Sequence, residues 1–167
     1  MQRVAVMGMG GSGKSTLARA LGQRLGLPVV HLDRVYWQPG WVELGRDQFT
    51  AEQERLTRQD QWIIDGNYSA TLALRLERAD TLIYLDLPTW LCLWRILRRA
   101  WRYRGRTRPD MTPGNRERLS LNFLWLVATH KYRSRPRVMK KFAQLAPHQH
   151  LVILKSTRQV KAFLNRV

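Results

Sequence analysis

Cysteine, acidic residues and long apolar stretches are all scarce in this sequence of 167 residues. The single cysteine, Cys92, excludes an internal disulfide and any zinc site built from cysteines, and it fits the reducing cytoplasm. No apolar stretch approaches the roughly 20 residues that a membrane-spanning helix needs. The first apolar run, residues 4–7, is too short for the core of a signal peptide, so we expect a cytoplasmic protein.

Acidic residues are few, and the positive charge is unevenly placed. The chain has 29 Lys and Arg against 12 Asp and Glu, and residues 95–141 alone hold 15 of the former and two of the latter. Such a segment favours a polyanionic partner, which is a nucleotide, a nucleic acid or an anionic lipid surface. Apolar residues make up 44% of the chain, which excludes disorder. We therefore expect one domain over residues 1–167, with 95–141 as a basic lid or helical insertion.

Short apolar runs alternate with helical patterns along the whole chain. Strands are predicted at 3–7, 29–32, 62–64, 81–87 and 150–154. Helices are predicted at 14–25, 46–59, 71–78, 89–103 and 117–134, and the Ser156 to Gln159 capping box opens a last one. Strands that alternate with helices predict an α/β fold, in which a parallel sheet carries helices on both faces.

A glycine-rich segment between the first strand and the first helix matches the pattern G-x-x-x-x-G-K-[ST]. Its glycines let backbone N–H groups curl around a phosphate, and the helix adds the positive end of its dipole. We expect Lys14 to reach the β- and γ-phosphates of ATP and Ser15 to ligate Mg²⁺. A glycine-rich turn that binds nothing is the alternative. The predicted nucleotide-binding residues of this loop are Gly8, Gly10, Gly11, Ser12, Gly13, Lys14, Ser15 and Thr16.

Two aspartates follow predicted strands, and the carboxyl ends of parallel strands meet at the phosphate loop. Asp65 is therefore expected to complete the Mg²⁺ site through a metal-bound water, unless it only forms a turn with Gly66. Asp33 is expected to orient or deprotonate an acceptor hydroxyl, unless it is a turn or capping residue. The aromatic segment 36–41 either walls an acceptor pocket or forms a hydrophobic plug. His31 is expected at the surface.

The basic segment begins with an amphipathic helix over residues 89–104. Its apolar stripe is expected to pack on the sheet, whereas its arginines repel each other and need an anion, unless they are only a solvated face. The arginine-rich loop after it is expected to close over polyphosphate as a lid and to exclude water from the transfer. The apolar stripe is Trp90, Leu93, Trp94, Leu97 and Trp101, and the basic stripe is Arg95, Arg98, Arg99 and Arg102.

Motifs spread over nearly the whole chain resemble the small P-loop kinases, the superfamily of adenylate, shikimate and gluconate kinases. The likeness is greatest to bacterial DNA topology modulation proteins that are described as adenylate-kinase-related. The motifs are residues 8–16, 31–41, 62–68, 84–88, 103–111 and 153–156. The resemblance implies a P-loop NTPase three-layer sandwich with a five-stranded parallel sheet and a helical, arginine-rich lid.

The same resemblance implies roles for particular residues. Arg95 and Arg99 occupy the place of the arginine pair that opens the lid helix of adenylate kinases, stacks on adenine and touches phosphate. Lys155 would border the adenine, and Asp33 matches the aspartate of shikimate kinases that binds the acceptor hydroxyl. Adenylate kinases have Phe-Pro-Arg where this chain has residues 67–69, Asn-Tyr-Ser, so a nucleoside monophosphate acceptor is not supported. A shikimate-type arginine pattern is also missing.

The sequence thus predicts an ATP-dependent phosphotransferase of unknown acceptor, with ATP and Mg²⁺ bound and with Lys14, Asp33, Arg95 and Arg99 as catalytic residues. The alternative is a nucleic-acid-associated P-loop ATPase or polynucleotide kinase involved in DNA topology modulation, which the basic segment 95–141 favours. Peripheral membrane attachment through the Trp/Arg helix is a third and disfavoured hypothesis, because the fold is expected to use the tryptophan stripe in its core.

Overall fold

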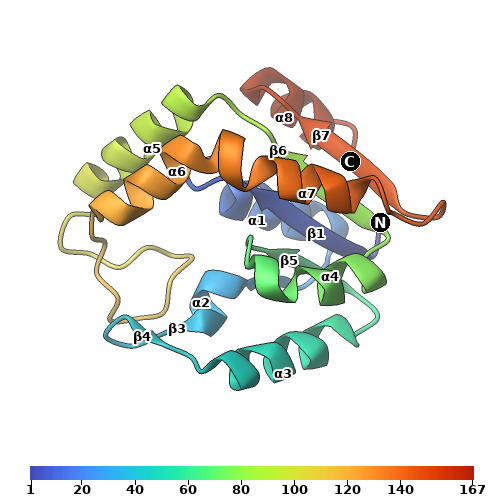
Figure 1. Cartoon of the computed structure of the whole chain (residues 1–167), viewed down its shortest axis with the longest axis horizontal. Helices are drawn as coiled ribbons and strands as arrows, with labels where there is room; N and C mark the ends of the chain where they lie inside the picture. The colour runs from blue at the N-terminus through green and yellow to red at the C-terminus, as the bar shows by residue number, and fades with distance from the viewer.

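The computed structural model describes all residues, 1–167, and contains the predicted parallel sheet (Figure 1). Its five strands are β1 (Arg3–Gly8), β2 (Val29–His31), β5 (Trp62–Asp65), β6 (Thr81–Leu85) and β7 (His150–Leu154). They lie in the order β2-β5-β1-β6-β7, and every neighbouring pair is parallel. The central strand β1 is nearly all buried, as expected for a sheet covered on both faces.

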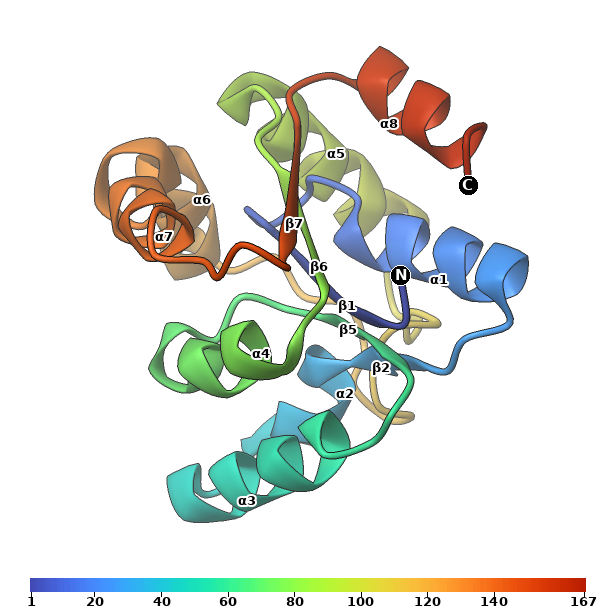
Figure 2. The same ribbon diagram turned by 90° about the vertical axis from the view of Figure 1, so that its right-hand side faces the viewer.

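Helices cover both faces of this sheet (Figure 2). Because side chains alternate along a strand, Val4 and Val6 of β1 face α1 (Lys14–Leu25) and α8 (Thr157–Leu164), which share one apolar cluster. Ala5 and Met7 face the opposite cluster, to which α3 (Arg46–Thr57), α4 (Leu72–Arg78) and α7 (Arg135–Phe142) contribute. The α/β prediction with helices on both faces is therefore confirmed.

The predicted basic segment forms a helical pair with a long loop at its end. Helix α5 (Thr89–Arg102) leads into the loop 103–120, and α6 (Leu121–Arg133) and α7 follow it. Helices α5 and α6 run in opposite directions, since Arg135 after α6 pairs with Asp86 before α5, and Glu117 before α6 pairs with Arg99 near the end of α5. No helix has the length and hydrophobicity that crossing a membrane requires.

Two boundaries that bear on the site differ from the sequence prediction. Strand β2 ends at His31, so Asp33 lies in the first turn of a short helix, α2 (Leu32–Tyr36), and not at a strand end. The residues after it form a small antiparallel hairpin, β3 (Trp37–Gln38) and β4 (Val42–Glu43), and a turn, η1 (Ser69–Thr71), precedes α4. Helix α6 begins at Leu121 and not at 117, because Ser120 caps it by accepting a hydrogen bond from the Phe123 N–H.

Of the apolar stripe of α5 only Leu93 packs against a core cluster, and the other four residues are exposed, which corrects the sequence prediction. Cys92 and Ile96 are the buried residues of this helix. Trp90 and Trp101 are 70% and 80% exposed. Helix α5 packs on the glycine-rich loop and on α6 through a narrow strip, so the residues on its opposite side project away from the protein. The other exposed members of the stripe are Trp94 and Leu97.

Candidate active site

The phosphate-loop sequence joins β1 to α1 and wraps the helix N-terminus, as its pattern predicts. Gly13 is the residue before α1 and has a left-handed φ of 96°. Gly11 also has a positive φ, 77°, and an added Cβ there would collide with the carbonyl oxygen of Cys92 in α5. The loop therefore needs glycine at these positions both for its curvature and for the close approach of α5.

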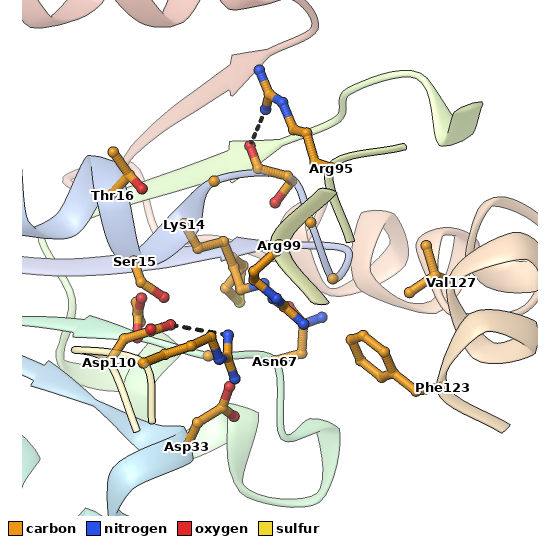
Figure 3. A pocket seen from close by; sticks show the side chains of 18 of the residues that line it. Lys14, Ser15, Thr16, Asp33, Asn67, Arg95, Arg99, Asp110, Phe123 and Val127 are labelled. Carbon is orange, nitrogen blue, oxygen red and sulfur yellow. Dashed lines mark hydrogen bonds and ion pairs between the residues drawn. The ribbon is translucent and has the colours of Figure 1, made fainter. Parts of the chain in front are cut away.

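The Lys14 side chain lies among carboxylates at the mouth of this loop (Figure 3). Its Nζ donates a 3.1 Å hydrogen bond to the carbonyl oxygen of Met9. Loss of solvent lowers the pKa of Lys14 from its ordinary value, and the charges of Asp65 and Asp33 oppose that shift. The Met9 carbonyl and the two carboxylates thus hold the ammonium close to the loop. The oxygens of a bound anion can take the place of these groups.

Asp65 is buried at the carboxyl end of β5, beside the end of β2. Parallel pairing places His31 next to it, and His31 Nδ1 lies 3.0 Å from Asp65 Oδ1. His31 is therefore a buried partner of the aspartate, which corrects the prediction of a surface histidine. The other carboxylate oxygen, Oδ2, is buried without a hydrogen-bond partner, although it belongs to a residue that lines the cavity.

A chain of hydrogen bonds from the interior of the protein positions Asp33. Tyr68 donates a 2.8 Å hydrogen bond from its hydroxyl to Asp33 Oδ1. The backbone of Tyr68 has an unusual φ of 23°, and the buried Arg75 of α4 donates to its carbonyl and to those of Gly66 and Asn67. Burial lowers the pKa of Arg75 to about 10. The guanidinium thus fixes the loop that positions Asp33.

The two arginines predicted from α5 both face the site. Arg95 Nη1 donates a 3.2 Å hydrogen bond to the carbonyl oxygen of Ser12 in the phosphate loop. Arg99 projects into the cavity, and its Nε lies 2.8 Å from Glu117 Oε1. The second oxygen of Glu117 lies 2.7 Å from Nε of Arg108, so one buried carboxylate holds two guanidinium groups. Four arginines on α5 thus have one acidic partner, and it comes from the loop 103–120.

A second carboxylate of the loop 103–120, Asp110, lies against the Ser15 hydroxyl (Figure 3). Burial by itself would raise the pKa of Asp110, but Arg108 and the hydrogen bonds that it accepts, including that of Ser15, outweigh this effect and lower the pKa. Arg108 Nη1 is 3.3 Å from Asp110 Oδ2. The loop 103–120 therefore brings negative as well as positive charge to the end of the phosphate loop.

The loop 103–120 is fastened to the β3–β4 hairpin across the site. Asn115 is buried, accepts a 2.8 Å hydrogen bond from the Trp41 N–H and donates one of 3.0 Å to the carbonyl of Gln38. Thr112 donates a 2.6 Å hydrogen bond to the carbonyl of Trp37. Trp37 and Trp41 line the cavity and pack edge to face, so the aromatic segment is both a pocket wall and a packed cluster.

These groups surround one cavity of about 1170 Å³. It brings together all the predicted phosphate-loop residues except Gly8, and it adds Asp33, Asp65, Arg95 and Arg99. Gly8 lies beneath the loop, where its N–H donates to Asn67 Oδ1. Lys155 does not line the cavity, although Thr157 and Val160 of α8 do.

The fold of the chain matches that of solved P-loop kinases. A shikimate kinase from Acinetobacter baumannii, solved with shikimate, superposes with a TM-score of 0.59 at 18% identity, over 99% of this chain and 90% of that one. A shikimate kinase from Bacteroides thetaiotaomicron gives 0.56 at 14% identity, over 99% and 95%. The chain has the fold of the small P-loop kinases.

A gluconokinase from Sinorhizobium meliloti has the same P-loop kinase fold, with a TM-score of 0.52 at 17% identity, over 99% of this chain and 92% of that one. No protein-family model and no curated protein matches the sequence. The resemblance to the small P-loop kinases is therefore confirmed at the level of fold, and the likeness to DNA topology modulation proteins stays a prediction.

Several residues of the site were missed by the sequence analysis. Residues 95–141 contain fifteen Lys and Arg but only two acidic residues, Asp110 and Glu117. This scarcity of carboxylates is a signal that the sequence offers. Tyr68 and Arg75 gave no signal, since a tyrosine after Asp-Gly-Asn and an arginine in a short helix are ordinary features. Their part follows only from the tertiary contacts.

Proposed function

We propose that the protein is an ATP-dependent phosphotransferase that acts on a hydroxyl group of a small molecule. One observation carries the proposal: Lys14, Asp33 and Arg99, from three distant segments of a P-loop kinase fold, line a single cavity. The phosphate loop and α1 would hold the β-phosphate, and Arg95 lies over the loop, where a guanidinium contacts phosphate or base.

The residues around the loop fit a divalent cation. Asp65 Oδ2 is buried and unpartnered, and the Ser15 hydroxyl is the P-loop group that ligates magnesium. Ser15 and Asp65, the latter through water, would hold Mg²⁺, and Asp110 lies next to Ser15. When bound, the cation neutralises charge on the β- and γ-phosphates during transfer.

Asp33 is the group on the acceptor side. In the proposed reaction its carboxylate orients the acceptor hydroxyl and takes its proton, while the acceptor oxygen bonds to the γ-phosphorus and the bond to ADP breaks. Tyr68 restrains one carboxylate oxygen and leaves the other for the acceptor. Lys14 and Arg99 would stabilise the charge on the phosphoryl group, and the fastened lid keeps water out.

The test is Mg²⁺-dependent ADP release by the purified protein, with no acceptor and with nucleoside monophosphates, nucleosides, hydroxylated metabolites or 5′-hydroxyl oligonucleotides. We expect stimulation by a hydroxylated small molecule, loss of that stimulation in Asp33→Asn, and loss of all turnover in Lys14→Ala. Lys161→Ala, an exposed lysine of α8, is the matched control. Normal turnover by Lys14→Ala would refute the proposal. Stimulation by oligonucleotides alone would instead favour the polynucleotide kinase or ATPase alternative.

A further inference from the structure

The outer face of the α5–α6 pair is apolar, cationic and free of acidic residues. Helix α5 exposes a stripe that includes Trp90 and Trp101, and α6 exposes Leu121 and Tyr132, which are 81% and 80% exposed. On each helix these side chains are opposite the buried residues, at the spacing of one helix face. The outer-face stripe is defined here as Trp90, Trp94, Leu97, Trp101, Leu121, Trp125 and Tyr132.

Both halves of this stripe lie on one side of the molecule. Helices α5 and α6 are antiparallel neighbours that share a small apolar cluster, which includes Ile96 and Val127. With about 100° per residue, the exposed stripe of each helix lies roughly 130–140° beyond its contact residue, Ile96 or Val127, in the same rotational sense along the chain. Because the two helices are antiparallel, equal rotations on each of them lead to the same side of the helix pair, so the two stripes lie on one side.

Cations surround this surface. The Arg98 guanidinium lies 4.8 Å above the Trp94 ring, and that of Arg133 lies 4.6 Å above the Trp125 ring. Lys131 of α6 is exposed as well. Neither helix contains an acidic residue, and the two carboxylates of the intervening loop point into the site. An apolar stripe with a cationic border and no anions is complementary to an anionic, partly apolar partner.

We propose that the outer face of α5 and α6 docks on the surface of an anionic lipid bilayer. Tryptophan and tyrosine favour the headgroup region, leucines insert among acyl chains, and arginines contact lipid phosphates. The objection to membrane attachment is that the tryptophan stripe is expected in the core, and the exposure of that stripe removes it. This inference is independent of the proposed function.

Two other occupants fit this surface less well. Single-stranded nucleic acid binds aromatic rings by base stacking, but Arg98 and Arg133 already cover faces of Trp94 and Trp125, and Leu121 offers no stacking surface. A second copy of this chain would bring like charges together, since the chain carries a net charge of +17.

Docking on this face leaves the candidate active site accessible from the other side of the helix. Arg95 and Arg99 lie about half a turn from the tryptophans on α5, and they contact Ser12 and Glu117 within the site. A membrane-bound protein would thus keep the phosphate loop on the side away from the lipid.

The test is flotation of the protein with vesicles of phosphatidylcholine, alone or with 30–40% phosphatidylglycerol (roughly the range in which anionic charge dominates). We expect binding to the anionic vesicles, reduced by 0.5 M salt. Trp90→Ser/Trp101→Ser should lower the partition about tenfold or more, because two exposed indoles are lost, and Lys131→Glu/Arg133→Glu should lower it comparably.

Matched controls separate the surface from general charge and hydrophobicity. Arg46→Glu/Arg58→Glu reverses two exposed charges, at the first residue of α3 and directly after its last, far from this face, and Val42→Ser removes an exposed apolar side chain. Both should bind vesicles as the parent does, and all variants should keep the parent melting temperature. No binding to anionic vesicles, or binding that the outer-face variants leave unchanged, would overturn the proposal. The proposal would also be overturned if the outer-face variants bound vesicles as the parent does but lost binding to an oligonucleotide or the ability to dimerise.

Discussion

The hydroxyl of Tyr68 donates a 2.8 Å hydrogen bond to Asp33 Oδ1, which joins the loop after β5 to the helix after β2. The Tyr68 ring packs against both Tyr36 and Phe49, and Arg75 donates to its backbone carbonyl, so apolar contacts and a hydrogen bond together set its position. Burial raises the pKa of Tyr68 well above its ordinary value, so the hydroxyl remains a donor at every working pH. The proposed base is therefore oriented by a rigid neighbour.

Removing this hydroxyl should impair transfer without unfolding the protein. In Tyr68→Phe the ring contacts persist, while Asp33 loses a charge-assisted hydrogen bond of about 1.5–3 kcal/mol. We expect acceptor-dependent kcat/KM to fall by about tenfold to a hundredfold, with ATP affinity unchanged, as measured by steady-state kinetics and nucleotide titration. Tyr36→Phe is the matched control, since its hydroxyl bonds to the exposed Glu43. An equal loss in both variants would contradict the positioning role of Tyr68.

The contact between lid and hairpin makes a separate prediction. Asn115→Ala removes three hydrogen bonds of a buried amide and leaves the Trp41 N–H without its partner, at a cost of about 1–3 kcal/mol. We expect the loop 103–120, which is rich in arginine, to open more often and to be cut by trypsin about tenfold faster or more. Asn122→Ala, an exposed asparagine of α6, should be cut at the parent rate. Equal rates in all three proteins would show that Asn115 does not fasten the lid.

The sheet was predictable from the sequence because apolar runs and glycine-rich turns are local signals. The roles of α5 were not, since helical periodicity separates two stripes without saying which of them faces inward. The inward face proved to be Cys92 and Ile96, because Gly11 allows the loop backbone to approach α5 so closely that only a narrow strip is covered. That approach depends on tertiary geometry.

His130 should make stability fall in mild acid. Its Nε2 lies 3.1 Å from the Tyr84 hydroxyl, in a buried position. Burial lowers the pKa of His130 below its ordinary value, Lys14 and Arg135 lower it further, and Asp86 opposes them. His130 therefore takes up a proton at a higher pH in the unfolded chain than in the folded one. The free energy of unfolding declines as the pH falls through 6.5, and the decline ends below the folded-state pKa.

Urea denaturation between pH 7.5 and 5 checks this dependence on pH. In His130→Asn the decline over this window should be shallower than in the parent, although the variant is less stable at pH 7.5 because the Tyr84 contact changes. His148→Asn removes an exposed histidine and should keep the parent slope. If His130→Asn and the parent have parallel pH profiles, another group is responsible for the acid sensitivity.

A pair of glycine substitutions tests whether α5 must touch the phosphate loop. Gly26 and Gly11 both have left-handed φ angles, 67° and 77°, so alanine strains the backbone at either position by about 1 kcal/mol. At Gly26 an added Cβ has no atom within 4 Å, whereas at Gly11 it meets the Cys92 carbonyl and lies 3.0 Å from Ile96 Cγ1.

Gly26→Ala should therefore lower the melting temperature by only about 2–4 °C and keep ATP affinity. Gly11→Ala should push α5 and its arginines away from the loop, with a larger loss of stability and at least about a tenfold loss of ATP affinity, measured by thermal denaturation and titration calorimetry. Similar effects of the two substitutions would mean that the contact between α5 and the loop adds nothing to nucleotide binding.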